Sequence, residues 1–508
     1  MQNRMKLKKH IAILICVLIG ICGAGCSSNK REVAAGTPKY IFLFIGDGMS
    51  YPQFQLASDY LGAMADGDYM AALPSISHEN RTGILDGPVE LNFMNFDEVG
   101  TAVTFDSCSF APDSAAAGTA IASGYKTYSS TINMDETKTI KFESIAEKIH
   151  SQLGWKVGIV SSANVNHATP AAFYAHQPTR NNYYEIGEEL MVSEFEFFAG
   201  GGFQDVYGAE GDKRSLYERA AEAGYTLAMT QKEAEMITAD HERVIVIDEN
   251  LADTNAMKYE IDRKEDEWSL ADHVEKGIEV LDNETGFFMM CEGGKIDWAC
   301  HANDAGTIIY DVLAFSEAVQ VAIDFAKEHP DETLIVVTGD HETGGLSIGY
   351  AETNYDTYLT NYSSQKISFQ KYTDEYVPVY KSDGTSFEEA MKDVEALFGL
   401  KLQGKQGDRL LLTEYETDKL RTAYEKSMKG YNRAEYSQEE YILYGTYDPF
   451  TVTVTHILNN KSGVDFTSYN HTGLPVAVFA NGIGAEVFEG YYDNTEIFHK
   501  LAGLTGVK

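Results

Sequence analysis

Residues 40–49 read YIFLFIGDGM, and this stretch decides the fold that we expect. The apolar residues Tyr40 to Ile45 are typical of a strand buried on both faces, as the strands of a parallel sheet are. Gly46-Asp47-Gly48 follows at once, and its two glycines allow the backbone and a ligand to come close to the aspartate. By itself Asp47 could equally be a turn or helix-capping residue, so the rest of the chain must decide its role.

The same pattern of an apolar run followed by a turn recurs along the chain. Four more runs predict buried parallel strands: Val157 to Val160, Phe287 to Met290, Thr333 to Thr338 and Val476 to Ala480. Helical periodicity lies between them, at Ser144 to Gln152, Leu216 to Ala223 and Tyr310 to Lys327. We therefore predict an α/β fold with a central, mostly parallel β-sheet and helices on both of its faces. Ligands bind at the carboxyl ends of the strands in such sheets.

Residues 350–465 are rich in tyrosine and charge, which indicates an insertion or cap on a catalytic domain of residues 39–349 and 466–508. We expect helices within the insertion at Phe387 to Phe398 and Thr413 to Met428. Thr451 to Thr455 reads TVTVT, and its alternation favours a strand although a helix is expected at that place. We leave the structure of this segment open.

Composition excludes some classes of function. The chain has 508 residues, of which 44% are hydrophobic, as is typical of a folded globular protein. Its formal charge of −37 argues against a nucleic-acid partner, because binding to a phosphate backbone requires a basic surface. An acidic protein can still bind phosphate where metal ions and an arginine make the local potential positive. Beyond the first residues the cysteines form no thiolate zinc site, and we expect no disulfide between Cys291 and Cys300.

The first residues predict export. A basic segment precedes the apolar run Ile11 to Gly25, which is too short for an ordinary membrane-spanning helix. The run ends in Gly-Ala-Gly-Cys26, which is similar to a bacterial lipoprotein processing site. We expect a signal peptide over residues 1–25, a lipid on Cys26, a linker over residues 26–38, and a location in the periplasm or on the cell surface. Simple cleavage or an uncleaved anchor is the alternative.

The most specific motif is Glu292-Gly-Gly-Lys-Ile-Asp297-Trp-Ala-Cys-His301, which follows the predicted strand that ends at Met290. Asp297 and His301 are four residues apart, a spacing that directs two ligands to one point from a helical turn. A surface ion pair beside a capping Glu292 would have the same spacing and is the alternative, but this motif is the more specific signal. The motif therefore predicts a metal site.

Two further motifs carry potential metal ligands. Asp340 and His341 follow the predicted strand Thr333 to Thr338 within TGDHETGG, and His471 lies in NHTG. Carboxylates and imidazoles without thiolates suit a catalytic zinc site, which keeps one coordination position open. The remaining histidines, among them His150, His176 and His456, we take to be surface or core residues.

Residues 112–120 read PDSAAAGTA, which places Ser114 at the start of a helix of small residues. Backbone N–H groups and the helix dipole favour a phosphate there, although Ser114 could equally be a plain N-cap. The two roles differ in whether a metal ion is available to ionise the hydroxyl. Further on, Thr169 could offer an oxygen to Mg²⁺, and Arg180 could bind two phosphate oxygens with its planar guanidinium.

Six segments, GDGM, PDSAAAGTA, HATPAA, EGGKID, TGDHETGG and NHTG, resemble the alkaline phosphatase family in content and in order. The similarity covers about residues 40–346 and 468–501, and it does not extend to the insertion. The resemblance implies hydrolysis of phosphate monoesters through a phosphoserine on Ser114, with two Zn²⁺ and one Mg²⁺ as cofactors. It also implies the fold of that family and allows a homodimer.

The resemblance further implies a role for each residue of the motifs. One zinc would be bound by Asp297, His301 and His471, and a second zinc by Asp47, Asp340 and His341. The magnesium would be bound by Asp47, Thr169 and Glu292. Ser114 would be the nucleophile, and Arg180 with Asp113 would bind the substrate.

Two residues beside the third metal differ from other members of the family. His167 stands where some members carry aspartate, and Trp298 stands where others carry lysine or histidine. His167 would bind the third metal directly or through a water molecule. The identity of that metal therefore stays open.

Three other functions are less compatible with these residues. A sulfatase requires Cys-x-Pro-x-Arg, which the segment Cys108-Ser-Phe-Ala-Pro112 does not provide. A phosphodiesterase of the same superfamily would be expected to lack the magnesium ligands and Arg180. A lipid-anchored surface protein that binds phosphate or metal without turnover would lack the nucleophile or a metal ligand, and the sequence retains them all.

Overall fold

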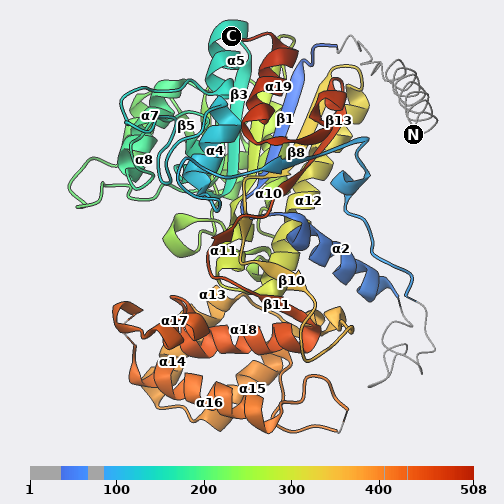
Figure 1. Ribbon diagram of the computed structural model, residues 1–508. Coiled ribbons are helices and arrows are strands. Elements are labelled where there is room, and N and C mark those ends of the chain that lie inside the picture. Colours follow the sequence, from blue (N-terminus) through green and yellow to red (C-terminus); the bar gives the residue numbers. More distant parts are fainter. Residues whose placement is uncertain (1–35, 67–84, 406, 432) are drawn as a thin grey trace, which may run out of the picture. The chain divides into compact units, whose positions relative to one another are not determined.

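The computed structural model describes residues 36–66, 85–405, 407–431 and 433–508; the predicted signal peptide and Cys26 lie outside these ranges. The compact unit Thr37–Lys508 is built on a ten-stranded sheet in the order β14-β2-β13-β8-β1-β7-β3-β4-β6-β5 (Figure 1). Its strands are β1 (Tyr40–Gly46), β2 (Glu98–Val103), β3 (Lys156–Asn164), β4 (Phe197–Gly201), β5 (Thr226–Ala228), β6 (Val244–Ile247), β7 (Phe287–Gly293), β8 (Thr333–Gly339), β13 (Val476–Gly482) and β14 (Gly490–Asp493).

The predicted parallel sheet is confirmed except at one strand. β13 runs antiparallel to both of its neighbours, β8 and β2, so the prediction that Val476 to Ala480 forms a parallel strand is wrong. The other strand pairs of this sheet are parallel. The chain enters β13 from the edge at which β1, β7 and β8 end, and it must therefore run in the opposite direction. As a result, His471, which precedes β13, lies at the same edge as the residues that follow the parallel strands.

Helices cover both faces of the sheet (Figure 1). Alternate residues of β1 enter two different cores, because successive side chains of a strand point to opposite faces. Phe42 and Phe44 pack into the core that includes helices α2, α10 and α12, and Ile41 and Leu43 pack into the core that includes α4, α5, α7 and α19. These helices are α2 (Tyr51–Ala65), α4 (Ser114–Ser123), α5 (Ile145–Leu153), α7 (Tyr183–Ser193), α10 (Leu270–Leu281), α12 (Ala305–Glu328) and α19 (Thr495–Thr505).

The segment between β10 (Leu346–Ile348) and β11 (Val464–Phe466) is helical, and we call it the insertion. β10 and β11 pair antiparallel, so the insertion leaves and re-enters the core at neighbouring strands. Its main helices are drawn in orange in Figure 1: α14 (Val377–Asp383), α15 (Phe387–Phe398), α16 (Glu414–Lys429), α17 (Gln438–Tyr444) and α18 (Pro449–Ser462).

The segment TVTVT, which the sequence leaves open, is helical and belongs to α18. Asp448 caps this helix by accepting hydrogen bonds from the backbone N–H groups of Phe450 and Thr451. All five residues of the segment are buried, so both its threonines and its valines lie in the interior and their alternation does not report a strand. The Thr453 hydroxyl donates to the carbonyl of Pro449 at 2.7 Å, within the same helix.

Two absences can be stated for the part of the chain that the structure describes. No helix there combines the length and the hydrophobicity that a membrane span requires. Cys291 and Cys300 are both buried and free.

Candidate active site and metal centres

The segments that follow β1, β7 and β8 bring the predicted site residues together, because these neighbouring parallel strands end at one edge. Carboxylates and histidines form three groups, in each of which the candidate ligand atoms lie within 4.8 Å of one another. The first group is Asp297, His301 and His471; the second is Asp47, Asp340 and His341; the third is Asp47, His167 and Glu292. No ion is present, and the fit of these groups to a metal has to be judged from their donors.

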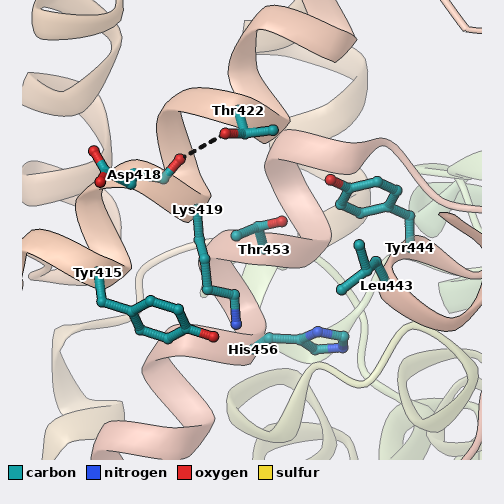
Figure 2. A pocket seen from close by; sticks show the side chains of 8 residues that line it. All are labelled: Tyr415, Asp418, Lys419, Thr422, Leu443, Tyr444, Thr453 and His456. Atoms are coloured by element: carbon teal, nitrogen blue, oxygen red, sulfur yellow. Dashed lines mark hydrogen bonds between the residues drawn. The ribbon is translucent and has the colours of Figure 1, made fainter. Parts of the chain in front are cut away.

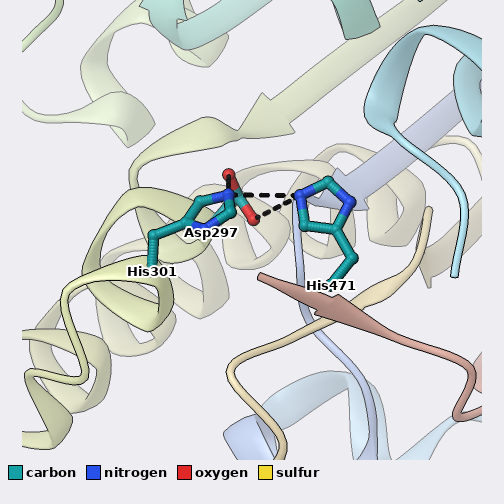
Figure 3. Close-up of side chains that lie close together, drawn as sticks. All are labelled: Asp297, His301 and His471. Carbon is teal, nitrogen blue, oxygen red and sulfur yellow. Dashed lines mark hydrogen bonds and ion pairs between the residues drawn. The ribbon is translucent and has the colours of Figure 1, made fainter. Parts of the chain in front are cut away.

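The first group combines two residues of helix α11 (Gly294–His301) with His471, and Figure 3 shows that their side chains converge. The His301 Nε2 atom lies 3.2 Å from Asp297 Oδ2 and 3.1 Å from His471 Nε2. The Nδ1 atoms of the two histidines lie 2.6 Å from the carbonyl of Tyr469 and 2.5 Å from that of Pro112. Each carbonyl accepts a hydrogen bond from Nδ1 and so directs Nε2 to the shared point, as partners of metal-bound histidines do.

In the second group, His341 Nε2 lies 3.3 Å from Asp340 Oδ2 and 3.4 Å from Asp47 Oδ1. Asp340 Oδ1 accepts hydrogen bonds from the backbone N–H groups of Gly48 and His341, at 3.1 and 2.9 Å. Gly48 has a φ of +68°, and a Cβ atom there would lie 2.8 Å from Asp297 Oδ1. Glycine at this position therefore permits both the turn and the close approach of the first and second groups.

In the third group, Glu292 is the last residue but one of β7 (Phe287–Gly293) and accepts a hydrogen bond from the Ser161 hydroxyl through Oε2. Its Oε1, both carboxylate oxygens of Asp47, Thr169 Oγ1 and His167 Nδ1 are buried without a hydrogen-bond partner. Buried polar atoms without partners cost free energy, so the four oxygens of this cluster fit a bound cation. Thr169 adds a hydroxyl to this group from the short helix α6 (Ala168–Ala171).

The pKa values of the second and third groups also fit sites for bound cations. Burial raises the pKa of Glu292 to about 7 and that of Asp340 to about 8. Burial, and then the charges of Asp340 and Asp297, raise the pKa of Asp47 well above its usual value. Burial lowers the pKa of His341 far below its usual value, which keeps the imidazole neutral, as a metal ligand must be. A divalent cation bound among these groups would permit the carboxylates to ionise.

Ser114 is the first residue of α4, and its N-cap is Asp113. Asp113 Oδ1 accepts a hydrogen bond from the backbone N–H of Ala116 at 3.1 Å, so the alternative that Ser114 is a plain N-cap is wrong. The Ser114 hydroxyl instead lies 3.2 Å from His341 Nε2. The hydroxyl thus lies directly beside the second group.

Arg180 forms hydrogen bonds both to Asp113, which precedes Ser114, and to His167 of the third group. Its guanidinium donates to Asp113 Oδ2 at 3.0 Å and to His167 Nε2 at 3.1 Å. Burial and the charge of Arg180 lower the pKa of His167 to about 3, so this imidazole is neutral. Because arginine only donates, Nε2 of His167 is the acceptor and Nδ1 carries the proton. Trp298 packs edge-on against His167, and Lys295 Nζ lies 4.3 Å from the Trp298 ring.

Sequence reasoning missed two residues of TGDHETGG that hold the site together. The Thr343 hydroxyl donates to Asp297 Oδ1 at 2.6 Å, which connects two of the motifs. Glu342 is fully buried and accepts hydrogen bonds from Gln53 Nε2 at 2.8 Å and from the Thr472 hydroxyl. The available signal was a glutamate placed between ligand-bearing residues and a glycine turn, where a surface role is improbable.

Comparison with known proteins gives a consistent result. The model of a family described as alkaline phosphatase matches residues 38–507. Alkaline phosphatase 4 of Bacillus subtilis (strain 168) is 30% identical to the chain, over 97% of the chain and 96% of that relative. The crystal structure of a cold-active alkaline phosphatase from Shewanella sp. is similar with a TM-score of 0.72 and 26% identity, covering 92% of this chain and 99% of that one. The alkaline phosphatase of Thermus thermophilus, at 22% identity and a TM-score of 0.72 over 93% of this chain and 92% of that one, has the same fold.

Proposed function

The chain belongs to the alkaline phosphatase family and is a phosphoric monoester hydrolase, and we propose that it acts through a phosphoserine on Ser114. One observation carries this proposal: the Ser114 hydroxyl lies 3.2 Å from His341 Nε2, inside the cluster of candidate metal ligands. A serine hydroxyl is a weak nucleophile unless a neighbouring group or metal ion lowers its pKa. The start of α4 also favours an anion at this position.

We assign one Zn²⁺ to the first group and a second Zn²⁺ to the second group, since both combine carboxylates with histidines. An Mg²⁺ would be held by Asp47, Thr169 and Glu292, which offer the oxygen donors that this ion prefers. When bound, these ions would lower the pKa of the Ser114 hydroxyl and stabilise negative charge on the leaving oxygen. The unpartnered oxygens of Asp47, Glu292 and Thr169 support this assignment.

The protein's own groups account for the remaining steps. The Ser114 oxygen attacks phosphorus, the bond from phosphorus to the leaving alcohol oxygen breaks, and water then hydrolyses the phosphoserine to release phosphate. Arg180 uses two of its N–H groups on Asp113 and His167, and its remaining donors are available for phosphate oxygens. Asp113 thus acts on the substrate by holding Arg180 beside Ser114.

His167 would serve the third metal through a water molecule and not as a direct ligand. Its Nε2 accepts from Arg180, and a neutral imidazole then carries its proton on Nδ1. An N–H group cannot bind a cation, but it can donate to a water molecule that does. Direct ligation would require Nε2 to carry the proton and therefore the loss of the bond to Arg180.

We further propose that the enzyme acts outside the cytoplasm, held to a bacterial membrane by a lipid on Cys26. The basic and apolar residues before Cys26 support this proposal. Small phosphate monoesters are the substrates expected there, and the strongly negative charge of −37 makes nucleic acid an improbable one. Family membership also makes a homodimer the form to test first by light scattering.

The experiment compares hydrolysis of a chromogenic phosphate monoester and a matched diester by wild type, Ser114→Ala and Ser123→Ala. Ser123 lies at the other end of α4 and bonds only within that helix, at 2.7 Å to the Thr119 carbonyl, so it controls for changes in the helix. We expect monoester turnover that a chelator abolishes, that Zn²⁺ and Mg²⁺ restore, and that only Ser114→Ala loses. Preference for the diester, or full activity of Ser114→Ala, would refute the proposal.

A further inference from the structure

Three residues, Ala302 to Asp304, join the helix that carries Asp297 and His301 to the next helix. Helix α11 ends at His301, and α12 begins at Ala305. Asn303 has a φ of +53°, a left-handed conformation that asparagine tolerates better than most residues. This sharp junction lies two residues from His301, so its geometry fixes where the helix end lies.

Asn303 binds the segment that leads to His471. Its Nδ2 donates to the carbonyls of Cys300 and Ser468, both at 2.9 Å. Because Nδ2 is used in this way, Oδ1 points in the other direction and accepts from His456 Nε2 at 3.2 Å. The backbone carbonyl of Asn303 accepts from Asn459 Nδ2 at 2.8 Å. Both of these donors lie on α18 of the insertion, three residues apart on one face.

Asp304 also accepts hydrogen bonds from the insertion. Its Oδ1 accepts from Gln365 Nε2 and its Oδ2 from the backbone N–H of Phe369, each at 2.8 Å. Asp304 is fully buried and also caps α12 by accepting from the Thr307 backbone N–H at 3.1 Å. Four hydrogen bonds from the insertion therefore end on Asn303 and Asp304 of this junction.

We propose that the insertion positions the first metal site, with His456 and Asn459 as positioning residues that hold Asn303 and thereby set the separation of His301 from His471. This inference rests on the proposed function, because it takes these histidines as zinc ligands. The two histidines come from distant parts of the chain, and Asn303 is bonded to both parts. A residue that holds a metal ligand in place typically changes metal affinity without touching the metal.

His456 is suited to this role. Burial and the charge of Lys419 lower its pKa to about 4, so the imidazole is neutral at working pH and Nε2 keeps its proton. On its other side the ring lines a cavity of about 270 Å³ together with Thr453 and Lys419 (Figure 2). Figure 2 shows Thr453 and His456 on the same helix, facing this cavity. A side chain of similar size can therefore replace either residue without a steric clash against a closed core.

The test uses three variants in the full, metal-loaded protein. His456→Gln keeps an N–H donor in reach of Asn303, and His456→Met keeps the size but removes the donor. Thr453→Val is the matched control, because it changes the same helix and cavity but removes only a hydroxyl bonded to Pro449 of the same helix. Each protein is mixed with a chromogenic chelator, and the time course of zinc release is recorded.

We expect His456→Met to release one zinc ion about tenfold faster than wild type, with the second zinc ion unchanged. His456→Gln should release zinc at nearly the wild-type rate, and Thr453→Val should release it at the wild-type rate. Equal release rates in His456→Met and Thr453→Val would overturn the inference, and so would an equal acceleration of both zinc ions, which indicates a general loosening of the fold. A wild type that holds no zinc would instead refute the proposed metal assignment, so the two failures are distinguishable.

Discussion

Asp340→Asn should stabilise the metal-free protein and destabilise the metal-loaded one. In the absence of metal, burial holds the pKa of Asp340 at about 8, against an ordinary value of 3.8. Asparagine removes the buried acid but keeps an oxygen for the backbone N–H groups of Gly48 and His341. In the presence of zinc the same substitution removes a proposed ligand. The sign of its effect should therefore reverse with the metal.

The pH dependence follows from the pKa of Asp340. Between its unfolded value of 3.8 and its folded value of about 8, the folded state binds more protons than the unfolded state. Stability therefore falls as the pH rises through this window, since ionisation favours unfolding. From about pH 6 to about pH 8 the free energy of unfolding of the metal-free wild type should fall by about 2 kcal/mol relative to Asp340→Asn. Histidines titrate in both proteins, and their effect cancels in this difference.

The assay is urea-induced unfolding, followed by circular dichroism, at several pH values with a chelator and again with zinc. Asp135→Asn serves as a control, because Asp135 has a pKa lowered to about 2 by hydrogen bonds, first from the Ile140 backbone N–H. Asp135 is ionised throughout the window, so the difference in the free energy of unfolding between wild type and Asp135→Asn should not change with pH. A pH-independent difference between wild type and Asp340→Asn would refute the reasoning, as would a variant that is more stable than wild type with zinc bound.

Two further predictions concern the neighbourhood of the site. Arg180→Lys should raise the inhibition constant of inorganic phosphate by about tenfold, because a lysine cannot bond Asp113 and phosphate oxygens with one planar group; an unchanged constant in a competition assay would contradict the assigned role. Glu342→Ala should lower the free energy of unfolding by about 3 kcal/mol, since it removes the acceptor of Gln53 Nε2, of the half-buried Thr472 hydroxyl and of the backbone N–H groups of Gly345 and Leu346; Glu342→Gln should lose less in the same urea titration.

The central strands could be predicted because they are buried on both faces and therefore consist almost entirely of apolar residues. Tyr40 to Ile45 is buried along its whole length, and a short, fully apolar run between glycine turns is the sequence signal of such a strand. The direction of Val476 to Ala480 could not be predicted, because burial on both faces looks the same in a parallel and an antiparallel strand. The direction depends on the edge from which the chain enters, and that edge is set by the pairing of His471 with Thr343.

The candidate ligands could be located because each lies within a few residues of a predicted strand or helix turn. That these residues bind metal stays a prediction, although the structure brings them together. Their supporting residues could not be predicted in this way. Asn303 and His456 are 153 residues apart in the sequence, and Gln53 and Glu342 are 289 apart, so no local pattern connects them. From the sequence alone, His456 is therefore predicted to be an ordinary surface or core residue.

Helix α18 explains why the insertion is coupled to the metal site. Residues Thr451 to Thr455 of α18 are all buried, so this part of the helix is enclosed by neighbouring elements. Phe450 and Val454 belong to the same continuous core as Phe315 of α12 and Phe44 of β1. An element shared between two bodies of the fold cannot move relative to either without opening a cavity, which costs free energy. A displacement of the insertion would therefore be transmitted to Asn303, and a rigid α18 is what allows His456 and Asn459 to hold it.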